Sequence, residues 1–165
     1  MQLTSSKSIK AAVVTISDRS FKGERQDLSG PALCSALAEK AQVSHTRTVP
    51  DDMELIKNVL TELADAGEVD VIFTTGGTGF SPRDITPEAT LAVIERSAAG
   101  ITEAMRSASL LKTERAMLSR ATAGIRGRTL IINLPGSPKA AVECLQVFLP
   151  VMAHAVEMLA GGDHS

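Results

Sequence analysis

Short apolar runs alternate with longer amphipathic segments along this chain. Runs rich in β-branched and aliphatic residues at 11–16, 43–49, 69–73 and 129–134 each predict a strand. Between the strands, apolar residues recur at helical spacing, most clearly at Leu55, Ile56, Val59, Leu60 and Leu63. This alternation predicts an α/β fold: a single three-layer domain in which a mostly parallel sheet carries helices on both faces.

Caps and breakers predict where the helices begin. Ser29-Gly30-Pro31 begins one helix, and Asp51 is expected to cap the next, with Glu54 completing a capping box. Others are expected around 87–97, 102–111 and 139–159, the last with an apolar stripe formed by Val142, Leu145, Leu149, Met152 and Val156. The domain is expected over residues 10–160, between a polar tail at 1–9 and a short tail at 161–165.

Ligands of open parallel sheets bind beyond the carboxyl ends of the strands. Four loops at 17–28, 50–52, 75–86 and 135–138 follow predicted strands and are therefore candidates for a site. Three of the four carry carboxylates. The fourth, Pro-Gly-Ser-Pro, precedes a helix with Lys139 in its first turn and suits an anionic ligand.

Residues 74–88 combine a strand end, a glycine turn, a carboxylate and a helix start, in the order Thr-Thr-Gly-Gly-Thr-Gly-Phe-Ser-Pro-Arg-Asp-Ile-Thr-Pro-Glu. The three glycines allow a close approach by a ligand. Thr86 is expected to cap the following helix, and Pro87 suits its first turn. Because a helix N-terminus after a glycine turn presents N–H groups to an anion, this segment predicts a phosphate-binding loop.

Two common nucleotide fingerprints are absent from this loop. It lacks the Gly-Lys-Ser/Thr ending of the P-loop, and it does not read G-x-G-x-x-G. It does contain Asp84, which would repel each unit of phosphate charge by about 4 kcal/mol at 4 Å and an effective dielectric near 20. A bridging cation resolves this repulsion, and Mg²⁺ is the natural candidate. The alternative is a tight strand–helix connection with no ligand.

Composition narrows the class of protein. The 165 residues carry a net charge of −2, with acidic and basic residues interspersed and only four Phe among the aromatics, which argues against nucleic-acid binding. Residues 1–10 lack an apolar signal segment, and no uninterrupted apolar stretch reaches membrane-spanning length. Cys34 and Cys144 are 110 positions apart and are expected to be free thiols, so the cytoplasm is expected.

Five segments, in order along residues 10–160, carry a family resemblance: Val-Thr-Ile-Ser-Asp-Arg at 14–19, Val-Pro-Asp-Asp at 49–52, the loop through Ala-Thr at 75–90, Ala-Met-Leu-Ser-Arg at 116–120, and Asn-Leu-Pro-Gly-Ser-Pro at 133–138. Together they closely resemble the molybdopterin adenylyltransferase family, which includes bacterial MogA and MoaB, the plant molybdenum-cofactor G domain and the G domain of gephyrin. The resemblance implies attack of molybdopterin's terminal phosphate on the α-phosphate of ATP, with Mg²⁺ present and pyrophosphate released.

The resemblance also implies residue roles. Asp51 and Asp84 match the family's essential aspartates, expected to hold Mg²⁺ and orient the triphosphate. The nucleotide-binding turn matches Gly76, Gly77, Thr78 and Gly79. Positions around the pterin and its phosphate match Ser17, Asp18, Ser109, Ser119, Arg120, Gly136, Ser137 and Pro138. Simpler alternatives are a helix cap for Asp51, local hydrogen bonding for the serines, and a surface charge for Arg120.

The resemblance further implies a homotrimer or a dimer of trimers. The chain carries no molybdenum-insertion domain of the kind fused to the plant and animal G domains, so a separate insertion protein is expected as partner. Two other functions remain open: a catalytically silent pterin-binding or scaffold homologue, and an unrelated nucleotide-binding enzyme on a similar sheet.

Overall fold

The computed structural model describes residues 8–162. A six-stranded sheet lies at its centre, in the order β2-β1-β3-β6-β5-β4. Its strands are β1 (Lys10–Ile16), β2 (Gln42–Val49), β3 (Val71–Thr75), β4 (Arg96–Ser97), β5 (Ala123–Arg126) and β6 (Thr129–Leu134). The pairs β1–β2, β1–β3 and β3–β6 are parallel, which confirms the mostly parallel sheet.

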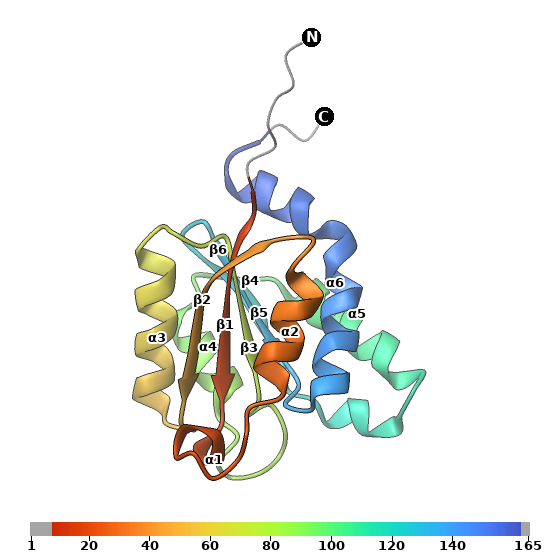
Figure 1. Cartoon of the computed structure of the whole chain (residues 1–165). Coiled ribbons are helices and arrows are strands. Elements are labelled where there is room, and N and C mark those ends of the chain that lie inside the picture. Colours follow the sequence, from red (N-terminus) through yellow and green to blue (C-terminus); the bar gives the residue numbers. More distant parts are fainter. Residues whose placement is uncertain (1–7, 163–165) are drawn as a thin grey trace.

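Helices cover both faces of the sheet, as Figure 1 shows. They are α1 (Asp18–Phe21), α2 (Ser29–Leu37), α3 (Met53–Asp65), α4 (Thr86–Val93), α5 (Ala99–Leu110) and α6 (Pro138–Leu159), with a 3₁₀ helix η1 (Glu114–Leu118). Helices α2, α5 and α6 pack on one face and α3 and α4 on the other, so the predicted three layers are confirmed. Of the expected tails, residues 1–7 and 163–165 lie outside the described part of the chain.

Alternating side chains of the buried strands supply two separate cores. In β1, Ala11 and Val13 belong to the core beneath α2, α5 and α6, whereas Ala12, Val14 and Ile16 belong to the core beneath α3 and α4. This division follows from the two-residue period of a strand, and it explains why the central strands read as continuous apolar runs.

The third quarter of the chain differs from the sequence-based expectation. The helix expected around 87–97 ends at Val93, and residues 96 and 97 instead form the short strand β4. Strand β5 was not predicted, and both strands run antiparallel to their neighbours. Strand β5 is placed by pairing with β6 and strand β4 by pairing with β5, because neither strand is long enough to show a period of its own.

Two predicted helix caps are wrong by one residue. Helix α3 begins at Met53, and Asp52 caps it by accepting the Leu55 N–H at 3.0 Å, so Asp51 is not the cap and the capping box with Glu54 does not form. Thr86 is the first residue of α4 rather than its cap. Because neither Asp51 nor Thr86 caps a helix, their side chains are available for the contacts with the glycine loop that are described below.

Helix α6 is long and apolar enough to cross a membrane by length and composition. Its residues Cys144, Leu145, Phe148 and Met152 are nevertheless buried in the core, and the ring of Phe148 meets Phe73 of β3 edge-on at 6.1 Å. Such packing is typical of the core helix of a globular domain.

Candidate active site

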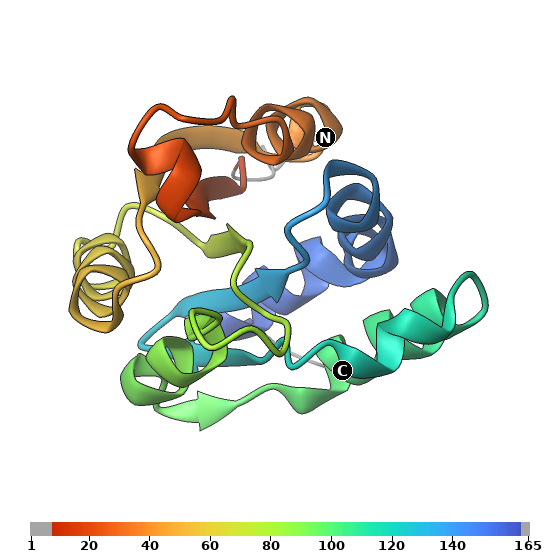
Figure 2. The ribbon, with the colours of Figure 1, turned by 90° about the horizontal axis from the view of Figure 1, so that it is seen from below.

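The four predicted loops lie together at one edge of the sheet, beyond the carboxyl ends of β1, β2, β3 and β6. Figure 2 views the molecule from this edge. The loop after β3, residues 76–85, runs beneath β6 and into α4. The topology therefore gathers segments that are more than 100 residues apart in the sequence.

The loop after β3 requires glycine at its first two positions. Gly76 and Gly77 have φ angles of +104° and +70°, which side-chain-bearing residues rarely adopt. A Cβ atom on Gly76 would also meet the carbonyl oxygen of Ile16 at less than 3.0 Å, and one on Gly77 would meet the hydroxyl of Thr86 at less than 3.0 Å. Glycine therefore allows the loop to pass close to β1 and α4.

The carbonyl groups of the glycine turn itself are bonded to protein. Thr86 donates its N–H to the Gly77 carbonyl at 3.1 Å and its hydroxyl to that of Gly76 at 2.9 Å. By contrast, the N–H groups of residues 77–80 have no acceptor within residues 8–162. A run of N–H groups left for a ligand is what an anion-binding turn provides.

Two of the predicted carboxylates lie against opposite ends of this turn. An Asp51 carboxylate oxygen lies 3.1 Å from the position that a Cβ on Gly77 would occupy, and an Asp84 oxygen lies 2.9 Å from the corresponding position at Gly79. The Asp84 carboxylate also accepts the Ser81 N–H, at 3.1 Å. The turn is therefore flanked by negative charge from both sides.

A third carboxylate, Asp18, is bonded to Asp51 through the backbone. The Asp18 N–H donates to Asp51 at 3.0 Å, and the Asp51 N–H donates to Asp18 at 3.0 Å. Arg83 donates to both oxygens of Asp18, at 2.9 and 2.8 Å, and thereby lowers the pKa of Asp18. Burial, with the nearby charges of Asp18 and Asp84, raises the pKa of Asp51.

These carboxylates suit a Mg²⁺ ion that is shared with a substrate. The raised pKa of Asp51 shows that its negative charge is poorly compensated by the protein, and a bound cation would supply that compensation. No group of three or more His, Cys, Asp or Glu side chains in the described residues could hold a metal by itself. Asp51 and Asp84 match the one or two carboxylates that hold Mg²⁺ when phosphate oxygens and water complete its coordination.

A cavity of about 670 Å³ opens beside the turn. Of the predicted residues, those that line it are Gly77, Thr78, Gly79, Asp84, Ser109, Ser119, Gly136 and Ser137. The Ser109 hydroxyl lies 3.5 Å from the buried Cys144 sulfur, and burial raises the pKa of that thiol. The cavity therefore combines polar groups at the turn with a wall from α5 and α6 that includes the buried side chains of Met105 and Cys144.

A smaller cavity of about 260 Å³ lies beyond β1 and β3 and is lined by Ser17, Gly76 and Pro138 among others. Ser17 accepts the Ser20 N–H and caps α1, while Ser137 accepts the Ala140 N–H and caps α6. Both serines thus have the local bonds that the simpler alternative predicts, in addition to facing a cavity. Asp18 lines neither of the two cavities.

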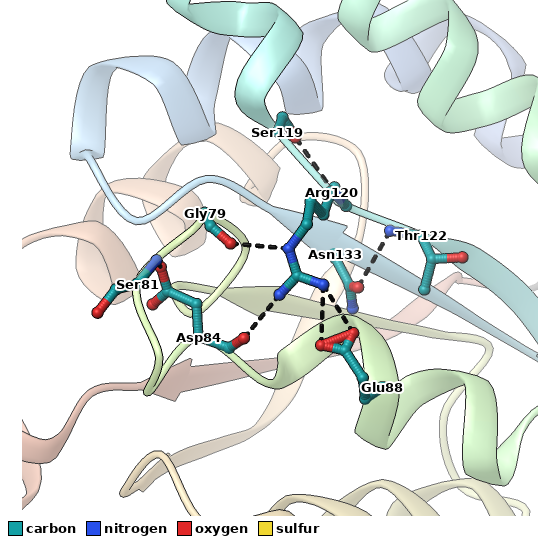
Figure 3. Close-up of polar contacts among 9 residues, drawn as sticks. Gly79, Ser81, Asp84, Glu88, Ser119, Arg120, Thr122 and Asn133 are labelled. Carbon is teal, nitrogen blue, oxygen red and sulfur yellow. Dashed lines mark hydrogen bonds and ion pairs between the residues drawn. The ribbon is translucent and has the colours of Figure 1, made fainter.

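Arg120 is not among the residues that line the larger cavity, and its side chain reaches into the glycine loop (Figure 3). Its guanidinium donates to the carbonyls of Gly79 and Asp84 at 2.8 and 2.6 Å, and to both oxygens of Glu88 at 2.9 and 2.8 Å. It is therefore not an unpaired surface charge. The expected contact with a pterin phosphate stays a prediction, and these bonds suggest another role, argued below.

Comparison with known proteins identifies the family of this chain. Residues 12–154 match the family model described as a probable molybdopterin binding domain. The chain is 42% identical over 156 residues to molybdopterin adenylyltransferase from Helicobacter pylori J99, covering 93% of this chain and 89% of the relative. The chain belongs to this molybdopterin-binding family. The family resemblance that the five sequence segments carry is thereby confirmed.

Solved and multidomain members of the family extend the comparison. The structure of the molybdopterin biosynthesis enzyme MoaB from Thermus thermophilus is similar at a TM-score of 0.88 and 46% identity, covering 95% of this chain and 99% of that one. Gephyrin from Dictyostelium discoideum is 41% identical over 158 residues, which cover 89% of this chain but 22% of gephyrin. This molybdopterin-binding domain therefore corresponds to one part of the longer protein.

Several residues at the candidate site of this chain were not predicted from the sequence. Arg106 and Arg115 supply positive charge to the wall of the larger cavity, and Arg106 donates to the Ala121 carbonyl at 2.8 Å. Arg106 precedes Ser109 by three positions on α5, a spacing that places both on one helix face and could have identified it. Asn133 is fully buried beneath the loop, where it donates to the hydroxyls of Thr74 and Thr90. The sequence could not identify these bonds of Asn133, because its partners on β3 and α4 become neighbours only in the folded chain.

Proposed function

We propose that this protein catalyses the Mg²⁺- and ATP-dependent adenylylation of molybdopterin. An oxygen of molybdopterin's terminal phosphate attacks the α-phosphorus of ATP, a new P–O–P linkage forms, and the bond to the β-phosphate breaks so that pyrophosphate leaves. Membership of the family and the names of the adenylyltransferase relatives support this reaction class. The cytoplasm is the proposed location.

The observation that carries the proposal is the arrangement of the glycine turn. Its residues Gly77 and Gly79 border the larger cavity, while the N–H groups of residues 77–80 have no acceptor within residues 8–162 and the carboxylates of Asp51 and Asp84 flank the turn. The glycine turn can therefore contact a triphosphate and, at the same time, a second substrate in the cavity. Phosphoryl-type transfer depends on such alignment and on charge compensation more than on covalent help from protein.

The two substrates take different parts of the site. The turn from Gly76 to Gly79, with Thr78, binds the nucleotide phosphates through backbone N–H groups. Asp51 and Asp84 orient the triphosphate by holding Mg²⁺, which when bound offsets the negative charge of the phosphate oxygens. The pterin and its phosphate occupy the larger cavity and its rim.

The pterin side of the site uses hydroxyls, backbone amides and arginines. The lining residues offered for it are Ser109, Ser119, Gly136, Ser137, Arg106 and Arg115. The two arginines carry positive charge suited to a phosphate oxygen. Ser17 and Pro138 border the smaller cavity, and Asp18 holds Asp51 and Arg83 in place. Assembly into a homotrimer or dimer of trimers, and delivery of the product to a separate molybdenum-insertion protein, belong to the same proposal.

Incubation of the pure protein with molybdopterin, ATP and Mg²⁺ tests the reaction. We expect adenylylated molybdopterin and pyrophosphate to appear in equal amounts, and neither to appear when EDTA removes Mg²⁺. Molybdopterin that binds tightly but yields no adenylylated product with ATP would contradict the proposal. It would instead identify the protein as the catalytically silent binding or scaffold homologue.

A further inference from the structure

Arg120 makes an unusually complete set of contacts with the glycine loop. Its backbone N–H donates to the Thr78 carbonyl at 2.8 Å, its Nε to Gly79 at 2.8 Å and its Nη2 to Asp84 at 2.6 Å. Nη1 donates to the Glu88 carboxylate in the first turn of α4. Figure 3 shows the side chain reaching from the segment before β5 into the loop after β3. Arg120 therefore joins two loops that are about 40 residues apart in the sequence.

The carbonyls to which Arg120 donates decide which way the loop amides face. Thr86 holds the carbonyls of residues 76 and 77, and Arg120 holds those of 78, 79 and 84. With these carbonyls drawn toward protein donors, the N–H groups of residues 77–80 are left without an acceptor in the described chain. Orienting several N–H groups in advance lowers the cost of binding an anion, because the backbone need not reorganise.

The ion pair of Arg120 with Glu88 argues against direct binding of a phosphate by Arg120. Both carboxylate oxygens of Glu88 lie within 2.9 Å of Nη1, so the positive charge of Arg120 is already paired. All three guanidinium nitrogens are engaged, and the side chain is not part of the wall of the larger cavity. Arg120 thus affects ligand binding by holding the loop in position rather than by contacting the ligand with its charge.

We propose that Arg120 is a positioning residue for the nucleotide: it fixes the carbonyls of the glycine turn so that the turn's amides face the phosphates. Glu88 anchors the guanidinium in that orientation. The assignment to a nucleotide rests on the proposed function above, whereas the effect on the loop does not. It also differs from the role expected from the sequence motifs, in which Arg120 contacts the pterin phosphate.

The test uses Arg120→Lys, which keeps the charge but cannot span three acceptors, and Glu88→Gln, which leaves Arg120 in place but weakens its anchor. Arg126→Lys is the matched control. Arg126 also donates to both oxygens of a carboxylate, Asp65, and to one carbonyl, that of Val93, but it lies on β5 away from the loop. Its substitution removes the same kinds of bonds without touching residues 76–86.

Three measurements are made on each variant and on the wild type. Calorimetry gives the affinity for the Mg²⁺ complex of α,β-methylene-ATP and, separately, for molybdopterin. Residue-resolved hydrogen exchange follows the amides of Asp84 and Thr86, which are bonded within the loop to the carbonyls of Ser81 and Gly77. These amides report loop order whether or not a nucleotide binds.

We expect Arg120→Lys to weaken nucleotide affinity by about 10-fold or more, since misplaced binding groups commonly cost this much. Glu88→Gln should shift the affinity in the same direction. Molybdopterin affinity should stay within about two-fold in both, as for substitutions at independent sites. The two loop amides should exchange faster in both variants, and Arg126→Lys should change none of these quantities.

Two results would overturn the inference. Loss of molybdopterin affinity with nucleotide affinity retained in Arg120→Lys would assign Arg120 to the pterin phosphate, and an equal loss of nucleotide affinity in Arg126→Lys would reduce the effect to general stability. If the wild type fails to bind the nucleotide analogue, the proposed function fails, and the exchange of Asp84 and Thr86 still decides whether Arg120 orders the loop.

Discussion

The substitution Gly76→Ala probes how closely the glycine loop approaches β1. Alanine would have to adopt a φ of +104°, at a cost of about 1–3 kcal/mol. Its Cβ would approach the Ile16 carbonyl within 3.0 Å, and overpacking against backbone costs roughly 1–3 kcal/mol. The smaller conformational entropy of unfolded alanine returns about 0.4–1 kcal/mol. The net expectation is a destabilisation of roughly 1–6 kcal/mol, or a fall in Tm of roughly 2–22 °C.

Two other glycines separate the strain from the clash. Gly127 also has a positive φ, +59°, but a Cβ there would meet no atom within 4 Å, so Gly127→Ala should cost about 1 kcal/mol from strain alone. Gly136 has no positive φ, and its Cβ would make an ordinary 3.4 Å contact with Gly76. Gly136→Ala should therefore change stability by no more than about 0.5 kcal/mol.

Thermal unfolding of the three variants and the wild type at one protein concentration tests the order of effects. We expect Gly76→Ala to lose the most, Gly127→Ala an intermediate amount, and Gly136→Ala almost nothing. If Gly76→Ala loses no more than Gly127→Ala, the close approach to the Ile16 carbonyl does not constrain the loop. The loop would then need glycine at this position for its conformation and not for space.

Three further predictions concern the carboxylates and assembly. In Asp84→Asn the side chain can still accept the Ser81 N–H but has lost its charge. Adenylyl transfer should therefore fall at least about 10-fold, or about 1.4 kcal/mol, while the affinity for molybdopterin stays unchanged. Turnover above a tenth of wild type in a product assay would exclude the metal-holding role of Asp84. Because burial and neighbouring charges raise the pKa of Asp51, its ionised form destabilises the metal-free fold, and stability is lost as pH rises through that raised pKa. Asp51→Asn should therefore raise the Tm at pH 7 and have little effect well below about pH 4, and an equal or lower Tm at pH 7 would contradict this. Light scattering should return a trimer or hexamer at micromolar concentration, and a monomer would disprove the proposed assembly.

Much of the fold was predictable because its signals are local. The apolar runs of the buried parallel strands and the amphipathic pattern of α3 placed four strands and several helices within a few residues of their observed bounds. The short strands β4 and β5 were missed because their conformation comes from pairing, of β5 with β6 and of β4 with β5, rather than from their own residues. The one-residue errors at the caps of α3 and α4 arose because Thr and Asp suit either side of a helix start, and only the hydrogen bonds decide.

The sequence by itself determined the family to which the chain belongs and predicted a phosphate-binding loop after β3, because glycines, carboxylates and helix starts in fixed order are short-range features. Only the tertiary structure decided how these features meet. It placed Asp51 and Asp84 on two sides of one turn, joined Asp18 to Arg83, and directed the Arg120 side chain into the loop. The contacts of Asp51 with Gly77, of Arg120 with Gly79 and of Asp18 with Arg83 link residues 26, 41 and 65 positions apart, and the order of the parallel strands brings these partners together, which no local pattern records.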